Sequence, residues 1–134
     1  MTTDKFIWIE VENTDDTVFV SCLGSAIESD RTAMEWSSEI KSLLDMAVGK
    51  FLIIDFTGIR ILTSLAMGEL IDIKFQTAEK QISLGLCGFS PNVRYVFSMT
   101  CLDQVFVIEE NRSAVTARLK ADLVTKKMPK AVRA

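Results

Sequence analysis

The sequence predicts a single α/β domain, a two-layer sandwich in which about four helices pack on a mixed, mostly parallel β-sheet. Three observations lead to this prediction. Two β-rich runs, 6–12 and 17–23, flank a polar turn cluster and indicate an antiparallel hairpin. The continuously apolar run 51–54 is typical of a strand buried on both faces of a parallel sheet. Helical and strand-like periods then alternate along the rest of the chain.

The first helix is predicted between the hairpin and the buried strand. Residues 29–32 offer several N-caps, and Thr32 with Glu35 has the spacing of a capping box. Apolar residues then recur at helical spacing and include Trp36, which we expect in the core. Gly49 is expected to end this helical region.

A second helix is predicted from Ser64, where the period changes from strand-like to helix-like. Its apolar stripe is expected to face the core, with Glu69 and Asp72 on the opposite, polar face. The stripe comprises Met67, Leu70, Ile71, Phe75 and Ala78. Ile73 lies off the stripe and is expected to form, with Leu65, a small exposed apolar patch that suits a protein partner.

The C-terminal part of the chain continues the alternation. A strand is predicted over 82–87, and Ser90 with Pro91 marks a helix start in which serine is the cap. A brief strand is predicted over 105–107, and Asn111 is expected to cap the last helix.

No linker or repeat divides the 134 residues, so we expect one domain over 1–123 followed by a basic, disordered tail over 124–134. The net charge of −3 and the scattered basic residues argue against a nucleic-acid surface. No apolar run is long enough for a membrane span, and no signal-peptide pattern is present, so a cytoplasmic protein is expected. The three cysteines lack Cys-x-x-Cys spacing and are expected to be buried.

Several kinds of chemistry lack their residues in this chain. Histidine is absent, which removes the usual general base, the serine or cysteine triads and the commonest nitrogen ligand of metals. No Gly-rich phosphate loop is found, and the cysteine spacing matches no zinc site. Asp55 is expected to bond the backbone of the turn that follows it. The sequence therefore predicts neither an enzyme nor a cofactor or metal site.

Ser64 has two roles open to it on these grounds. A serine at a helix start can cap the helix, as can the adjacent Thr63, and it can also present its hydroxyl to a kinase.

Four strings in the sequence resemble those of STAS domains, the module of anti-sigma factor antagonists and of sulfate-transporter tails. STAS domains typically have a strand that ends in Asp, an Asp-Ser-Ser-Gly or Asp-Ser-Thr-Gly turn, a Leu-Ser-Pro-like helix start and a Thr-Gly-Leu-Asp string before a Phe. The corresponding strings are Asp55-Phe56-Thr57-Gly58, Thr63-Ser64-Leu65-Ala66, Gly88-Phe89-Ser90-Pro91 and Thr100-Cys101-Leu102-Asp103-Gln104-Val105-Phe106. The resemblance covers about residues 5–123 and implies a STAS-like sandwich.

The resemblance implies a binding protein in transcription regulation, an anti-sigma factor antagonist that sequesters an anti-sigma factor serine kinase. In the family this kinase phosphorylates the first serine of the turn, and Ser64 stands at that position, with Thr63 as a weaker acceptor. The partner is then expected to contact Thr63, Ser64, Leu65, Gly68, Glu69, Asp72 and Ile73. The alternative is a phosphorylation-independent STAS scaffold, such as a small subunit of a multi-protein complex or of a lipid-transport system.

The turn departs from the family pattern at three positions. Thr63 replaces the Asp, Leu65 replaces the second hydroxyl residue, and Ala66 replaces the Gly. Because threonine also caps a helix well, the local structure is expected to be preserved.

Overall fold

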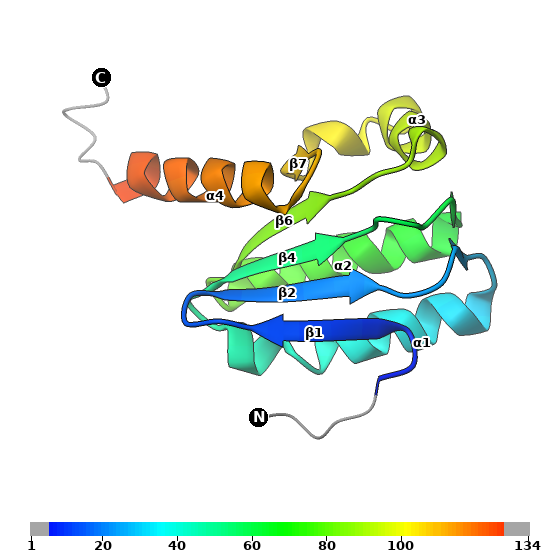
Figure 1. Cartoon of the computed structure of the whole chain (residues 1–134), viewed down its shortest axis with the longest axis horizontal. Coiled ribbons are helices and arrows are strands. Elements are labelled where there is room, and N and C mark those ends of the chain that lie inside the picture. The colour runs from blue at the N-terminus through cyan, green and yellow to red at the C-terminus, as the bar shows by residue number, and fades with distance from the viewer. Residues whose placement is uncertain (1–5, 128–134) are drawn as a thin grey trace.

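The computed structural model describes residues 6–127, with side chains as far as Thr125. At its centre is a five-stranded sheet with the strand order β1-β2-β4-β6-β7 (Figure 1). The strands are β1 (Ile9–Asn13), β2 (Thr17–Cys22), β4 (Phe51–Asp55), β6 (Ser83–Cys87) and β7 (Ile108–Glu109). β1 runs antiparallel to β2, and the other pairs are parallel. The predicted hairpin and the mixed, mostly parallel sheet are therefore confirmed.

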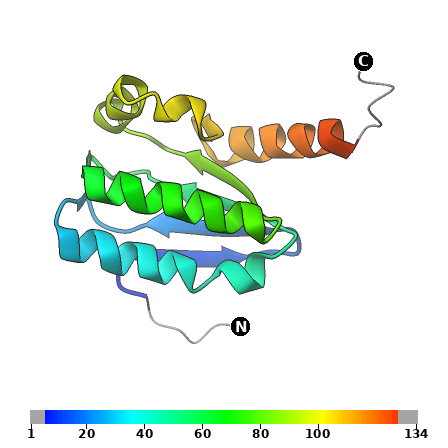
Figure 2. The ribbon, with the colours of Figure 1, turned by 180° about the vertical axis from the view of Figure 1, so that it is seen from behind.

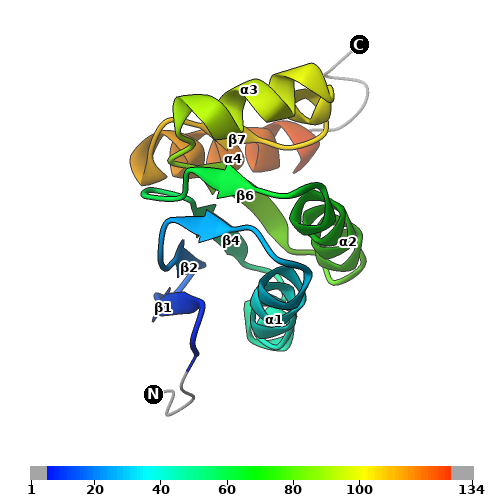
Figure 3. The ribbon, with the colours of Figure 1, turned by 90° about the vertical axis from the view of Figure 1, so that its right-hand side faces the viewer.

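Four α-helices and two short 3-10 helices pack around this sheet within the described residues. In chain order they are α1 (Asp30–Lys41), η1 (Leu44–Ala47), α2 (Ser64–Glu79), α3 (Pro91–Met99), η2 (Leu102–Gln104) and α4 (Arg112–Lys127). α1 and α2 lie side by side on one face (Figures 2 and 3). α4 packs on the other face against β4 and β6.

The core divides between the two faces because strand side chains alternate. In β4, Leu52 and Ile54 join the larger cluster beneath α1 and α2, while Phe51 and Ile53 join the smaller cluster beneath α4. The fully buried Trp36 belongs to the larger cluster, as predicted.

Gly85 allows α4 to approach β6 closely. A Cβ atom at this position would lie 2.5 Å from the Cγ2 atom of Val115 and 2.9 Å from the Cδ1 atom of Leu119. Any larger residue would therefore displace the helix or its side chains.

All three helix caps fall at predicted positions, although the capping box predicted at α1 does not form. Ser90 caps α3, of which Pro91 is the first residue. The side chain of Asn111 accepts a hydrogen bond from the Ala114 amide at the start of α4. At α1, however, the cap is Ser29 and not the Thr32–Glu35 box. The carboxylate of Glu35 instead accepts from the indole of Trp8 and from the side chain of Arg31.

Several element boundaries differ from the prediction. α1 ends at Lys41, and η1 lies between it and Gly49. The last strand is Ile108–Glu109 and not 105–107, because the chain pairs with β6 only after it has left η2. α4 continues through Lys127, so residues 124–127 of the predicted tail are helical. The remainder of that tail, 128–134, lies outside the described residues.

The three cysteines do not share one environment. Cys22 and Cys87 are buried, as predicted, but Cys101 is exposed, so the prediction is wrong there. Cys101, which follows the C-cap residue of α3, occupies a left-handed backbone conformation with φ of 62°.

Candidate functional site

The loop from β4 to α2 carries Ser64 and is held at its start by Asp55. The Oδ1 atom of Asp55 accepts from the amide of Thr57 at 3.0 Å and from its hydroxyl at 2.7 Å. The predicted bond from Asp55 to the backbone of the following turn is thus confirmed. Phe56 and Ile59 are fully buried and anchor the turn in the core.

A second, two-stranded sheet holds the later part of the same loop. β3 (Ala26–Ile27) and β5 (Ile61–Leu62) pair in parallel. The Arg60 amide donates to the Ser25 carbonyl at 2.7 Å, and the Thr63 amide donates to the Ile27 carbonyl at 3.1 Å. These bonds fix the backbone immediately before Ser64.

The structure separates the two roles that the sequence left open at the start of α2. The cap is Thr63, whose hydroxyl accepts from the Ala66 amide at 3.2 Å. Ser64 is the first helical residue and is exposed, and no group within residues 6–127 bonds its hydroxyl. The first turn of α2 contains no acidic residue. The hydroxyl of Ser64 is therefore free for another use.

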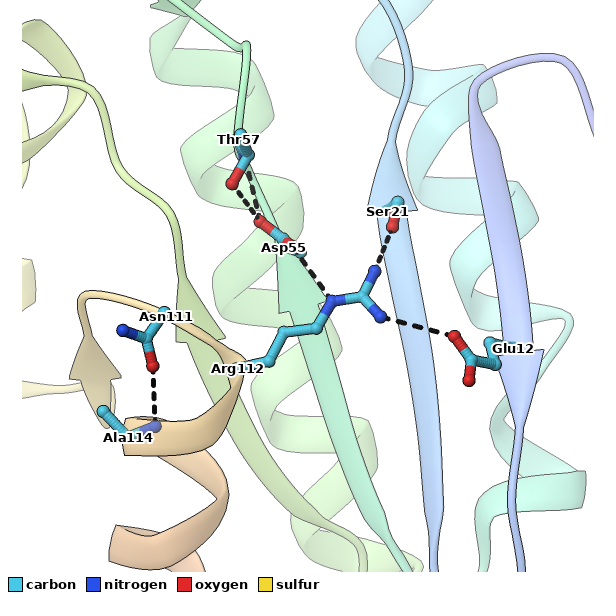
Figure 4. A network of polar contacts seen from close by, with 7 residues as sticks. All are labelled: Glu12, Ser21, Asp55, Thr57, Asn111, Arg112 and Ala114. Carbon is cyan, nitrogen blue, oxygen red and sulfur yellow. Dashed lines mark hydrogen bonds and ion pairs between the residues drawn. The ribbon is translucent and has the colours of Figure 1, made fainter.

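Arg112, at the start of α4, links this loop to the strands beside it (Figure 4). Its Nε atom donates to the Oδ2 atom of Asp55 at 3.0 Å, and its other nitrogens donate to Ser21 and Glu12. Its guanidinium also lies 4.9 Å from the centre of the Phe19 ring. Burial alone would raise the pKa of Asp55, but hydrogen bonds from Thr57 and Arg112 lower it below the ordinary value.

Sequence reasoning missed Arg112, because an arginine at a helix start normally faces solvent. The positions of Ser21 and Asp55 in the predicted strands could have indicated a polar site for such a residue. Ser21 and Asp55 lie near the carboxyl ends of neighbouring parallel strands, and such ends meet at one edge of a sheet.

Two acidic residues predicted to face a partner are engaged within the domain. Lys41 of α1 lies 3.0 Å from Glu69 and 2.6 Å from Asp72, and the Ser37 hydroxyl donates to Glu69 at 2.7 Å. The hydrogen bond from Ser37 holds the pKa of Glu69 below its usual value, and the bond from Lys41 does the same for Asp72. The Glu69 side chain is only 18% exposed, whereas that of Asp72 is 51% exposed.

The expected exposure of Ile73 is wrong. Ile73 is fully buried, while Phe75, which was expected in the core, is 66% exposed. α2 carries apolar residues around most of its circumference, so their spacing alone did not identify the buried face. The predicted patch of Ile73 with Leu65 therefore does not form, and Leu65 itself is half-buried against the core.

The outward face of α2 is instead an outer stripe formed by Ser64, Gly68, Ile71 and Phe75. Their spacing of four, three and four residues places them on one side of the helix. Ser64, Gly68 and Phe75 are exposed, and Ile71 is half-buried. Of the predicted partner-binding residues, the structure thus places Ser64 and Gly68 together on the accessible surface.

A family model for the STAS domain matches residues 10–115. This chain belongs to the STAS domain family. The resemblance in its sequence is thereby confirmed, although no curated protein sequence matches this STAS domain.

Solved structures share the fold of this STAS domain. An anti-sigma factor antagonist domain protein from Planctomyces limnophilus aligns with a TM-score of 0.73 and 17% identity over 84% of this chain and 97% of its own. An anti-sigma factor antagonist from Mycobacterium paratuberculosis aligns with a TM-score of 0.73 and 20% identity over 84% of this chain and 92% of its own. The anti-sigma factor antagonist SpoIIAA in its unphosphorylated form aligns with a TM-score of 0.67 and 18% identity over 84% of this chain and 96% of its own. At these identities the likeness establishes the fold alone.

Two observations on the described residues concern metal binding and membrane insertion. Among the described residues, no three or more cysteine, aspartate or glutamate side chains gather in an arrangement that would hold a metal ion. Within the same part of the chain, no helix has both the length and the apolar character that a membrane span requires.

Proposed function

We propose that this STAS domain acts by binding, as an anti-sigma factor antagonist that sequesters an anti-sigma factor kinase in the cytoplasm. The outer stripe of α2 is the contact surface, and phosphorylation of Ser64 ends the contact. The protein is a binding partner and not an enzyme. The family membership supports this class of function, and Bacillus SpoIIAA, a protein of this fold, has a structure in a phosphorylated form.

The free hydroxyl of Ser64 carries the proposal. It is exposed at the first position of a helix, and Thr63 supplies the cap. Phosphorylation would therefore leave the cap intact.

The electrostatic surroundings of Ser64 also suit a phosphate. The amides of Ser64 and Leu65 have no backbone acceptor in the described chain, as expected of the first donors in a helix. Arg60 is exposed in the preceding loop, and the first turn of α2 has no carboxylate. A helix N-terminus stabilises a negative charge by up to roughly 2 kcal/mol. The domain should stay folded when a phosphate adds about −1.5 to −2 charge.

The three departures in the turn are compatible with this role. Thr63 performs the capping that an Asp would perform, and Leu65 packs against the core. Ala66 is fully buried, so its methyl group adds to the core where the family has Gly. None of these replacements covers the Ser64 hydroxyl.

The proposal is tested by incubating the protein with ATP and each anti-sigma factor serine kinase encoded in the same genome, followed by intact mass. One added phosphoryl group is expected, and Ser64→Ala should abolish it while Thr63→Val should not. Incorporation that persists in Ser64→Ala would place the modification elsewhere and refute the switch at Ser64.

A phosphorylation-independent scaffold is the second candidate, and the exposed Phe75 favours it. A 66% exposed aromatic ring beside the half-buried Ile71 can hold a partner without any modification. This candidate predicts partner binding that Phe75→Ala removes and that Ser64→Asp leaves unchanged. Neighbouring genes for a multi-protein complex or a lipid-transport system would support it.

A further inference from the structure

We propose that the free edge of β6 binds an extended peptide segment of a protein partner as an added β-strand. β7 is only two residues long and pairs with Leu86 and Cys87. The first half of β6, Ser83–Gly85, therefore has no strand on that side, as Figure 1 shows for the short β7 at the far end of β6.

The hydrogen bonds of β6 show which backbone groups are free. The Ser83 amide donates to the Lys50 carbonyl at 3.0 Å and the Leu86 amide donates to the Val107 carbonyl at 2.8 Å, on opposite sides of the strand. Because these directions alternate along a strand, the amide and carbonyl of Leu84 point to the same side as those of Leu86. No backbone group among residues 6–127 pairs with Leu84 there.

The unpaired amide and carbonyl of Leu84 are available to an added strand. Leu84 is only 9% exposed, and nearly all buried backbone groups in proteins have a hydrogen-bond partner. A strand laid along the edge would supply both a donor and an acceptor. Strand addition to a free edge is a common mode of peptide recognition.

A groove beside this edge has room for such a strand. A cavity of about 390 Å³ lies there between α2 and α4. Its apolar lining comprises Ala78, Ile82, Leu84, Val107, Leu119 and Leu123. The occupant therefore gains apolar contacts on both faces in addition to backbone pairing.

Two charges in the groove define the chemistry of the occupant. The ammonium of Lys74 on α2 lies 5.8 Å from the centre of the Phe106 ring, and Asp122 lies on α4. Neither forms an ion pair with another described residue. Since the side chains of an added strand alternate between the α2 and α4 faces, the segment should place an acidic residue toward Lys74 and a basic residue toward Asp122. It should contain no proline where its amide must pair with Leu84.

The groove and Ser64 lie at different ends of α2. The groove lies toward the C-terminal end of α2, on Lys74, Thr77 and Ala78, whereas Ser64 begins the helix. The two surfaces can therefore be tested separately.

The test pans phage-displayed random dodecapeptides against the full chain and measures the enriched peptides by fluorescence polarisation. Peptides with adjacent acidic and basic residues are expected. Lys74→Glu should weaken their binding about three- to tenfold. Replacing the acidic peptide residue with lysine should restore it. Arg31→Glu makes the same charge change at an 87% exposed site on α1 and should have no effect.

Amide exchange of Leu84 gives a second measurement. In the complex this amide should exchange at least about tenfold more slowly than in the free protein. Proline at the central peptide position should abolish both binding and protection. Panning that enriches no peptide sensitive to Lys74→Glu would overturn the proposal.

Two other occupants would also overturn it. If Leu84 is already protected in the free monomer and loses protection when residues 128–134 are removed, the chain's own end fills the groove. If protection rises with protein concentration together with dimer formation, a second copy does.

Discussion

Replacing Asp55 with alanine removes three hydrogen bonds at once, two from Thr57 and one from Arg112. The Asp55 side chain is 15% exposed and that of Arg112 is 36% exposed, so solvent screens the pair in part. Hydrogen bonds to charged groups contribute about 1.5–3 kcal/mol each when fully protected. With partial exposure we expect Asp55→Ala to cost about 2–3 kcal/mol and Arg112→Ala about 1–2 kcal/mol.

The direct measurement is a double-mutant cycle by urea unfolding at neutral pH. Asp55 and Arg112 should show a coupling free energy of about 1 kcal/mol. The pKa of Asp55 is lower in the folded than in the unfolded state, so its stabilisation is complete above the unfolded value of about 3.9. The stabilisation is lost as pH falls through the folded pKa. A coupling below about 0.3 kcal/mol, or a cost of Asp55→Ala that stays constant into acid, would refute the reasoning.

Three further predictions concern caps, core and thiols. Thr63→Ala should lower the free energy of unfolding, measured in urea, by about 1 kcal/mol, and Ser64→Ala should lower it by less than about 0.5 kcal/mol. An equal loss in both variants would show that Ser64 takes part in the cap. Ile73→Ala should cost about 2–4 kcal/mol and Phe75→Ala less than about 0.5 kcal/mol in the same assay, and the reverse order would restore the face predicted from the sequence. Burial raises the pKa of the Cys22 and Cys87 thiols to about 12, so the exposed Cys101 should react first with a maleimide in the native protein. Early modification at a buried site, seen by peptide mass, would contradict this.

The antiparallel hairpin and the buried strand of the mostly parallel sheet could be predicted because they rest on local patterns. The continuous apolar run 51–54 indicated a strand covered on both faces, and Phe51–Ile54 is buried in that way. The caps Ser90 and Asn111 are likewise local signals, and both were predicted correctly.

The features that were missed depend on contacts between distant residues. The ion pair of Arg112 with Asp55 joins positions 57 apart, and no local period reports it. Lys41 of α1 pairs with Glu69 and Asp72, so these residues lie on the side of α2 that faces α1, a contact that the spacing within α2 does not reveal. The sequence identified Ser64 but did not show that Thr63 is the residue that caps α2, because either hydroxyl can cap a helix.

The affinity for the anti-sigma factor kinase, measured by calorimetry for the unmodified and the Ser64-phosphorylated protein, tests the central claim most directly. The account predicts tight binding of the unmodified form and a loss of at least about tenfold on phosphorylation. Ser64→Asp should also weaken binding, while the neutral control Ser64→Asn should not, and both should unfold near the wild-type temperature. Equal affinity of the phosphorylated and unmodified proteins would contradict the proposed switch.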